Sequence, residues 1–174
     1  MHNTIKNFSQ HGTFSFTPEN LKRAEEVLAK YPKDKKRSAV MPLLYLVQEQ
    51  HDNWISIDAM DYIAKMLEIP SMYVYEVAHF YTMYNKEPVG KYLFQVCRTT
   101  PCWLRGSDEI LVSCKKHLGI CVGQTSEDGK FSLVEVECLG ACINAPIVQI
   151  NNDYYEHLTP EATIELIESL KVKK

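Results

Sequence analysis

Two close pairs of cysteines constrain this chain more than any other feature of its sequence. Cys97 and Cys102 form a C-x4-C motif, and Cys138 and Cys142 form a C-x3-C motif. Each pair begins at the end of a run that is rich in aromatic and β-branched residues, 92–96 before Cys97 and 131–137 before Cys138. We therefore expect both pairs to lie where a strand ends and a loop begins, with residues 98–101 as the loop between Cys97 and Cys102. The rest of the chain is interpreted as the scaffold that brings the pairs together.

Thiols presented in pairs are typical of metal ligation. In a two-iron cluster each tetrahedral iron binds two bridging sulfides and needs two more ligands, so one cysteine pair per iron suits a [2Fe–2S] cluster. Zinc also binds four cysteines, usually on tighter C-x2-C knuckles, so a zinc-stabilised binding module stays open as an alternative. The sequence lacks the C-x-x-C of a dithiol redox site, and no histidine adjoins either pair, which disfavours a Rieske cluster.

The two remaining cysteines are not assigned as ligands. Cys114 has the spacing of a buried helix position, and Cys121 follows that helix in a loop. Around the four paired cysteines, Gly140 would let the backbone approach a cluster closely. We expect the apolar residues beside them to screen the site from water, namely Pro101, Trp103, Leu139 and Ala141.

Composition excludes several other functions. The net charge of −3 and the absence of a long basic run exclude a nucleic-acid surface, and no apolar run approaches the roughly 20 residues that cross a bilayer. There is no glycine-rich phosphate loop and no carboxylate pair that stands out as general acid and base. These absences favour an electron carrier without a substrate site of its own.

The order of expected elements predicts an α+β fold in two modules, residues 1–87 and 88–174. The first dozen residues are interpreted as a loose arm, and four helices follow, near 18–31, 36–51, 56–67 and 71–81. The second module has a strand at 92–96, a helix capped by Ser107 and ended by Gly119, and a strand at 131–137. A hairpin at 147–155 and a last helix after Thr159-Pro160 complete it.

The N-terminal sequence has neither the apolar segment of a secretory signal nor the arginine-rich pattern of a transit peptide. We therefore expect the chain to remain in the compartment where it is made. In a reducing cytosol its six cysteines are expected to be metal ligands or buried thiols rather than disulfides.

Several runs resemble one known family. Residues 96–102 (VCRTTPC), 104–107 (LRGS) and 137–146 (ECLGACINAP) resemble the 24 kDa subunits of respiratory complex I, whose bacterial members are the E subunits of NADH:quinone oxidoreductase. The upstream run 77–83 (VAHFYTM) is similar to the same family. The likeness covers roughly residues 15 to 170.

This resemblance implies a thioredoxin-like ferredoxin domain, with a mixed sheet and flanking helices, preceded by a helical module. It implies one [2Fe–2S] cluster held by four cysteines, namely Cys97, Cys102, Cys138 and Cys142. It also implies that the chain exchanges single electrons with the flavin of a partner subunit that binds FMN and oxidises NADH.

Through that partner the chain would join the peripheral arm of a proton-translocating NADH:quinone oxidoreductase. It would then lie in the cytoplasm, on the inner face of a bacterial plasma membrane, without inserting into it. Equivalent subunits of NAD-linked hydrogenases and formate dehydrogenases carry similar motifs, so they stay open as alternatives.

Overall fold

The computed structural model describes residues 13–173. Residues 1–12, for which the sequence suggests a loose arm, lie outside the described part. The chain divides into two compact units, Met1–Pro88 and Val89–Lys174. Each unit has its own apolar core. No helix within residues 13–173 is both long and apolar enough to cross a membrane.

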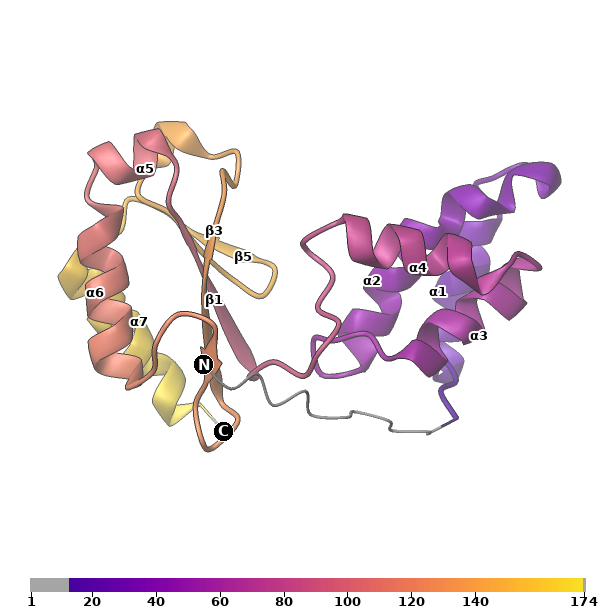
Figure 1. Cartoon of the computed structure of the whole chain (residues 1–174), viewed down its shortest axis with the longest axis horizontal. Coiled ribbons are helices and arrows are strands. Elements are labelled where there is room, and N and C mark those ends of the chain that lie inside the picture. The colour runs from indigo at the N-terminus through magenta and orange to yellow at the C-terminus, as the bar shows by residue number, and fades with distance from the viewer. Residues whose placement is uncertain (1–12, 174) are drawn as a thin grey trace. The chain divides into compact units, whose positions relative to one another are not determined.

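The first unit is helical (Figure 1). Its elements are α1 (Pro18–Leu28), the 3-10 segment η1 (Lys33–Ala39), α2 (Val40–Gln50), α3 (Ile57–Leu67) and α4 (Ser71–Phe80). The expected single helix at 36–51 is therefore wrong in its first part, which is a 3-10 segment. Pro42 lies in the first turn of α2, where its missing N–H costs no helical hydrogen bond.

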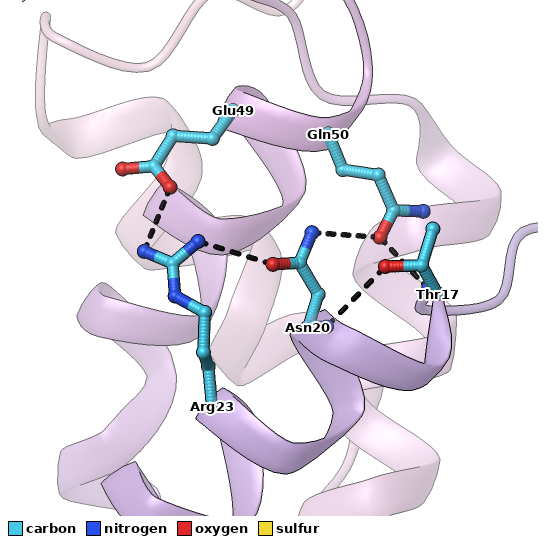
Figure 2. Close-up of polar contacts among 5 residues, drawn as sticks. All are labelled: Thr17, Asn20, Arg23, Glu49 and Gln50. Carbon is cyan, nitrogen blue, oxygen red and sulfur yellow. Dashed lines mark hydrogen bonds and ion pairs between the residues drawn. The ribbon is translucent and has the colours of Figure 1, made fainter.

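Side-chain caps begin two of these helices. The hydroxyl of Thr17 accepts a hydrogen bond from the N–H of Asn20, and that of Ser56 accepts one from Ala59. The start of α1 is also tied to the end of α2, because the Gln50 side chain accepts hydrogen bonds from the Thr17 N–H and the Asn20 amide, both at 3.0 Å (Figure 2). One turn further along α1, Arg23 pairs with Glu49 at 2.9 Å.

The core of the helical unit is built from the apolar stripes of these helices. Leu43 and Leu44 of α2 and Ile63 of α3 are fully buried, and each such side chain contributes about 2 kcal/mol when removed from water. After α4 the chain returns across α2. Tyr84 is buried there, and its hydroxyl donates a hydrogen bond to the carbonyl of Met41 at 3.0 Å.

The second unit is a five-stranded mixed sheet with helices, which confirms the predicted fold class. Its strands lie in the order β2-β3-β1-β4-β5, with β1 and β3 parallel and the other neighbours antiparallel. Their bounds are β1 (Tyr92–Cys97), β2 (Gln124–Thr125), β3 (Phe131–Val136), β4 (Val148–Ile150) and β5 (Asp153–Tyr155). The two-residue β2 carries no apolar pattern, and the sequence did not predict it.

Helices α6 (Ser107–Leu118) and α7 (Pro160–Val172) lie together beside this sheet (Figure 1). Ile110 of α6 and Ile167 of α7 pack with Phe94 and Leu133 of the central strands. At the start of β1, the backbone of Gly90 lies against that of Phe131 so closely that a Cβ at Gly90 would meet it at 2.6 Å. The sheet is thereby closely packed at the amino-terminal ends of β1 and β3.

Two expectations about the segment between β1 and α6 are wrong. Residues 98–101 are not all loop, because a short helix, α5 (Thr100–Leu104), begins there with Pro101 in its first turn. Ser107 is not the cap of α6. Gly106 takes that position in a left-handed conformation, and Ser107 is a buried residue of the first turn. Gly119 does end α6, as predicted.

Candidate metal centre

The parallel pairing of β1 and β3 brings the two cysteine pairs to one edge of the sheet. Parallel strands end at the same edge, and Cys97, the last residue of β1, is in register with Val136, the last residue of β3. Cys138 follows Val136 after a single residue. The crossover between the two strands contains α5, which carries Cys102. Residues far apart in the chain therefore meet at one site.

The first pair is held by regular structure and is buried. Cys97 and Cys102 are each 1% exposed and pack with Ala145 and Ile147 in a small apolar cluster. The backbone on both sides of Cys97 is hydrogen bonded, since its own N–H donates to Ile147 and that of Arg98 donates to Val136. Cys102 lies in the single helical turn of α5, so this pair is placed by a strand end and a helix rather than by a strand and a loop.

The second pair lies on an irregular loop and is exposed. The sulfurs of Cys138 and Cys142 are 3.3 Å apart, and the N–H of Gly140 donates to the Cys138 sulfur at 3.4 Å. Gly140 has a φ of +86°, which a side chain would disfavour, and open space surrounds the position of its missing Cβ. Glycine is needed here for its backbone conformation, and its close approach to a cluster stays a prediction.

Polar groups on each loop act on the sulfurs of the other pair. The backbone N–H of Leu139, between Cys138 and Cys142, reaches the sulfur of Cys97. The hydroxyl of Thr99, between Cys97 and Cys102, lies 3.4 Å from the Cys97 sulfur, and it also lowers the pKa of Cys138. Each loop thus places a polar group near a sulfur of the other pair.

Within each pair, the pKa of one thiol is lowered and that of the other is raised. Burial raises the pKa of Cys102 to about 11, with a further contribution from the neighbouring Cys97 thiolate. Burial also acts to raise the pKa of Cys97, but hydrogen bonds from Thr99 outweigh it and leave that pKa below the ordinary value. In the second pair, the Gly140 N–H lowers the pKa of Cys138, and the hydrogen bond with Cys138 raises that of Cys142. A metal that binds either pair must therefore displace at least one proton.

The sulfur positions suit ligation in pairs. Metal–sulfur bonds of about 2.3 Å at tetrahedral angles place two sulfurs about 3.8 Å apart, about half an ångström more than between Cys138 and Cys142. Across residues 13–173, no three side chains of the His, Cys, Asp and Glu types gather around a single ion position. A two-iron cluster has no such requirement, because sulfides complete the coordination of each iron. Two pairs of cysteine thiols match the two protein ligands that each iron of such a cluster needs.

The side chains around the four cysteines only partly screen the site from water. Leu139 and Ala141 pack against the apolar cluster around the first pair, as expected. Trp103 does not screen it, because its side chain is 56% exposed and its indole N–H donates to Asp108. Ile143, directly after Cys142, is 91% exposed. One pocket runs beside Cys142, and its other lining residues are Pro101, Leu104, Arg105, Ile143 and Ala145.

Two contributors near the site were missed by the sequence. Thr99 was treated only as part of a loop. The hydroxyl of Tyr154, in β5, donates a hydrogen bond to the carbonyl of Leu139 at 2.6 Å and so braces the second loop. Nothing in the sequence near Tyr154 signals this contact, since its partner is a backbone atom 15 residues away. Cys114 is fully buried in α6 and Cys121 is exposed, and neither belongs to the two cysteine pairs.

The chain is similar to several known proteins over most of its length. The sequence profile of the thioredoxin-like [2Fe–2S] ferredoxin family matches residues 24–171. The E subunit of the NADH-quinone oxidoreductase of Rickettsia bellii is 57% identical over 158 residues, which cover 91% of this chain and 95% of that protein. The mitochondrial NADH dehydrogenase [ubiquinone] flavoprotein 2 of Dictyostelium discoideum is 55% identical over 166 residues, or 95% of this chain and 67% of that one.

A solved structure supports the fold. The match is to an NAD+-reducing [NiFe]-hydrogenase in the H2-reduced state, with a TM-score of 0.64 and 18% identity over 76% of this chain and 22% of the hydrogenase chain. At that identity the likeness extends to the fold alone. The family match and the high identity to the bacterial relative go further: this chain belongs to the thioredoxin-like [2Fe–2S] ferredoxin family, among the E subunits of NADH-quinone oxidoreductase.

Proposed function

We propose that this chain is the electron-transfer E subunit of an NADH:quinone oxidoreductase, and that Cys97, Cys102, Cys138 and Cys142 hold its [2Fe–2S] cluster. Cys97 and Cys102 would bind one iron, and Cys138 and Cys142 the other. When bound, the cluster accepts and returns one electron at a time. The observation that carries the proposal is the meeting of both cysteine pairs at the shared end of β1 and β3.

In this proposal the protein gives the two irons different surroundings. The buried first pair keeps water from one side, because its sulfurs lie against Ala145 and Ile147. The exposed second pair leaves the other side at the surface, with Ile143 and Leu104 beside it. Exposed apolar side chains at that side suit a surface that a partner covers. Electrons would enter and leave there.

We propose that the partner is the subunit that binds FMN and oxidises NADH, and that electrons pass between its flavin and this chain. The N-terminal module, 1–87, and the ferredoxin module, 88–174, would both belong to the peripheral arm of the complex. The arm would lie in the cytoplasm on the inner face of a bacterial plasma membrane. The high identity to E subunits of NADH-quinone oxidoreductase supports this assignment over the equivalent subunit of a hydrogenase or a formate dehydrogenase.

Metal analysis and electron paramagnetic resonance test the cluster. Chain purified without oxygen is expected to contain about two irons and two labile sulfides, and to give the signal of one unpaired electron after reduction with dithionite. Bound zinc without sulfide, and a sample without any signal, would contradict the proposal and favour the zinc-stabilised module.

Purification of the native complex tests the parent enzyme. A tag on this chain is expected to recover a flavin-containing subunit and membrane subunits with NADH:quinone oxidoreductase activity. Recovery of a hydrogenase or a formate dehydrogenase instead would leave the cluster assignment intact and reject complex I as the parent.

A further inference from the structure

We propose that the Thr99 hydroxyl donates a hydrogen bond to the Cys97 sulfur and raises the reduction potential of the bound cluster. The inference rests on the proposed function, because it requires that these cysteines hold a [2Fe–2S] cluster. It assigns a task to a residue that lies between Cys97 and Cys102 but is not itself a ligand.

The position of Thr99 is set by two elements. It follows the end of β1 by two residues and is the cap of α5, and its carbonyl accepts a hydrogen bond from the N–H of Trp103 at 3.0 Å. Its side chain makes no capping hydrogen bond to α5, so the hydroxyl is free for the sulfurs. It lies 3.4 Å from the Cys97 sulfur.

The direction of this hydrogen bond follows from metal binding. Between a thiol and a hydroxyl, either group can donate. A metal-bound cysteine has lost its proton and can only accept. In the loaded protein the hydroxyl of Thr99 must therefore be the donor.

Such a donor favours the reduced state. With four thiolates the oxidised cluster carries a formal charge of −2, and reduction by one electron makes it −3. A hydrogen bond to a ligand sulfur strengthens as that negative charge grows, so it stabilises the reduced form more than the oxidised form. The electron comes from the reductant, and the Thr99 hydroxyl keeps its proton throughout.

The Thr99 hydroxyl is also the donor that a substitution can remove. Other donors to these sulfurs are the backbone N–H groups of Thr99 itself, Leu139 and Gly140, together with that of Ile147, which acts on Cys102. Substitution of those side chains leaves their N–H groups in place. Replacement of Thr99 by valine keeps the β-branched shape and removes the hydroxyl alone.

A redox titration of the full chain, followed by electron paramagnetic resonance with dithionite as the reductant, tests the inference. Thr99→Val and Thr99→Ala are both expected to shift the midpoint potential to more negative values and to alter the g values of the reduced signal. Thr99→Ser keeps the hydroxyl and should restore the wild-type midpoint. Thr100→Val, at the exposed neighbouring residue, should leave it unchanged.

The outcomes separate this inference from the proposed function. An unchanged midpoint in a cluster-loaded Thr99→Val or Thr99→Ala chain overturns the role of the hydroxyl and leaves the cluster assignment standing. Equal shifts in Thr99→Ser and Thr99→Val also overturn it, because the effect would then not depend on the hydroxyl. A wild-type chain without iron and sulfide would reject the proposed function, and the inference with it.

Discussion

The two cysteine pairs occupy one site but are held in different ways. Cys97 and Cys102 are each 1% exposed and are placed by a strand end and a helical turn. Cys138 and Cys142 are exposed, on a loop that depends on a positive φ at Gly140 and a hydrogen bond from Tyr154. Core packing thus positions the first pair, and local loop contacts position the second.

This difference separates two requirements of an electron carrier. A cluster has to be held firmly and shielded, which suits the first pair, and it has to lie near a partner, which suits the second. A site buried on both sides would slow electron exchange, and one exposed on both sides would be open to water. Four predictions test this contrast, and the largest expected effect comes from removing a ligand.

Loss of one exposed ligand should abolish the cluster, even though regular structure holds the buried pair in place. We expect Cys138→Ser to lose nearly all iron and sulfide, because one iron would keep a single protein thiolate. Cys114→Ser and Cys121→Ser are the controls, since neither cysteine belongs to a pair, and both should retain the cluster. Burial raises the pKa of Cys114 to about 12, so it stays a protonated thiol at neutral pH. Equal iron contents in all three variants would contradict the ligand assignment.

The exposed side of the site should be the side that a partner covers. Ile143→Glu would place a charge beside Cys142 in that contact, at a cost on the order of 3 kcal/mol, or about a hundredfold in affinity. The measurement is recovery of the flavin-containing subunit with the tagged chain, together with the cluster signal, which should persist.

Val172→Glu is the matched control, because Val172 is 83% exposed but ends α7 beside the start of β3, away from the cysteines. Full recovery of the partner with Ile143→Glu would place the interface elsewhere. A loss that is equal in both variants would indicate a general effect of the added charge.

The sequence predicted the strand that leads to each cysteine pair better than the short helix and the loop contacts around the pairs. Strand patterns located Cys97 and Cys138 at strand ends, because alternation and β-branched residues report directly on burial in a sheet. The helix α5 was missed since a single turn is too short to show a period, although Pro101 at its start was a signal. The brace from Tyr154 to Leu139 was not predictable, because a hydrogen bond to a backbone carbonyl leaves no trace in residue type.

The same reasoning explains the missed β2 strand and the mistaken cap of α6. The short β2 is exposed and is held by backbone pairing with β3 alone. At the start of α6, Ser107 and Gly106 are both residues that favour helix caps. Which of them takes that position depends on the left-handed turn after α5, a tertiary feature.

In the cluster-free chain, the two pairs should differ in reactivity toward an alkylating reagent. Iodoacetamide reaches Cys138 and Cys142 directly, whereas Cys97 and Cys102 require local opening of the fold. We expect the exposed pair to react at least about tenfold faster at neutral pH. Mass spectrometry of peptides at successive times measures each site, and the rates should converge in denaturant. Equal rates without denaturant would show that the first pair is not protected before the metal binds.

The smallest effect is expected from the brace on the second loop. Tyr154→Phe removes the hydrogen bond to the carbonyl of Leu139 and keeps the ring. Such a bond contributes about 1 kcal/mol, so iron should be lost to a chelator about fivefold faster. Tyr155→Phe, on the same strand, is the control and should lose iron at the wild-type rate. Because Tyr154 is 45% exposed, the thermal unfolding midpoint should change little. A lower thermal unfolding midpoint with an unaltered rate of iron loss would contradict this prediction. It would show that Tyr154 stabilises the fold and that the cluster itself holds the loop.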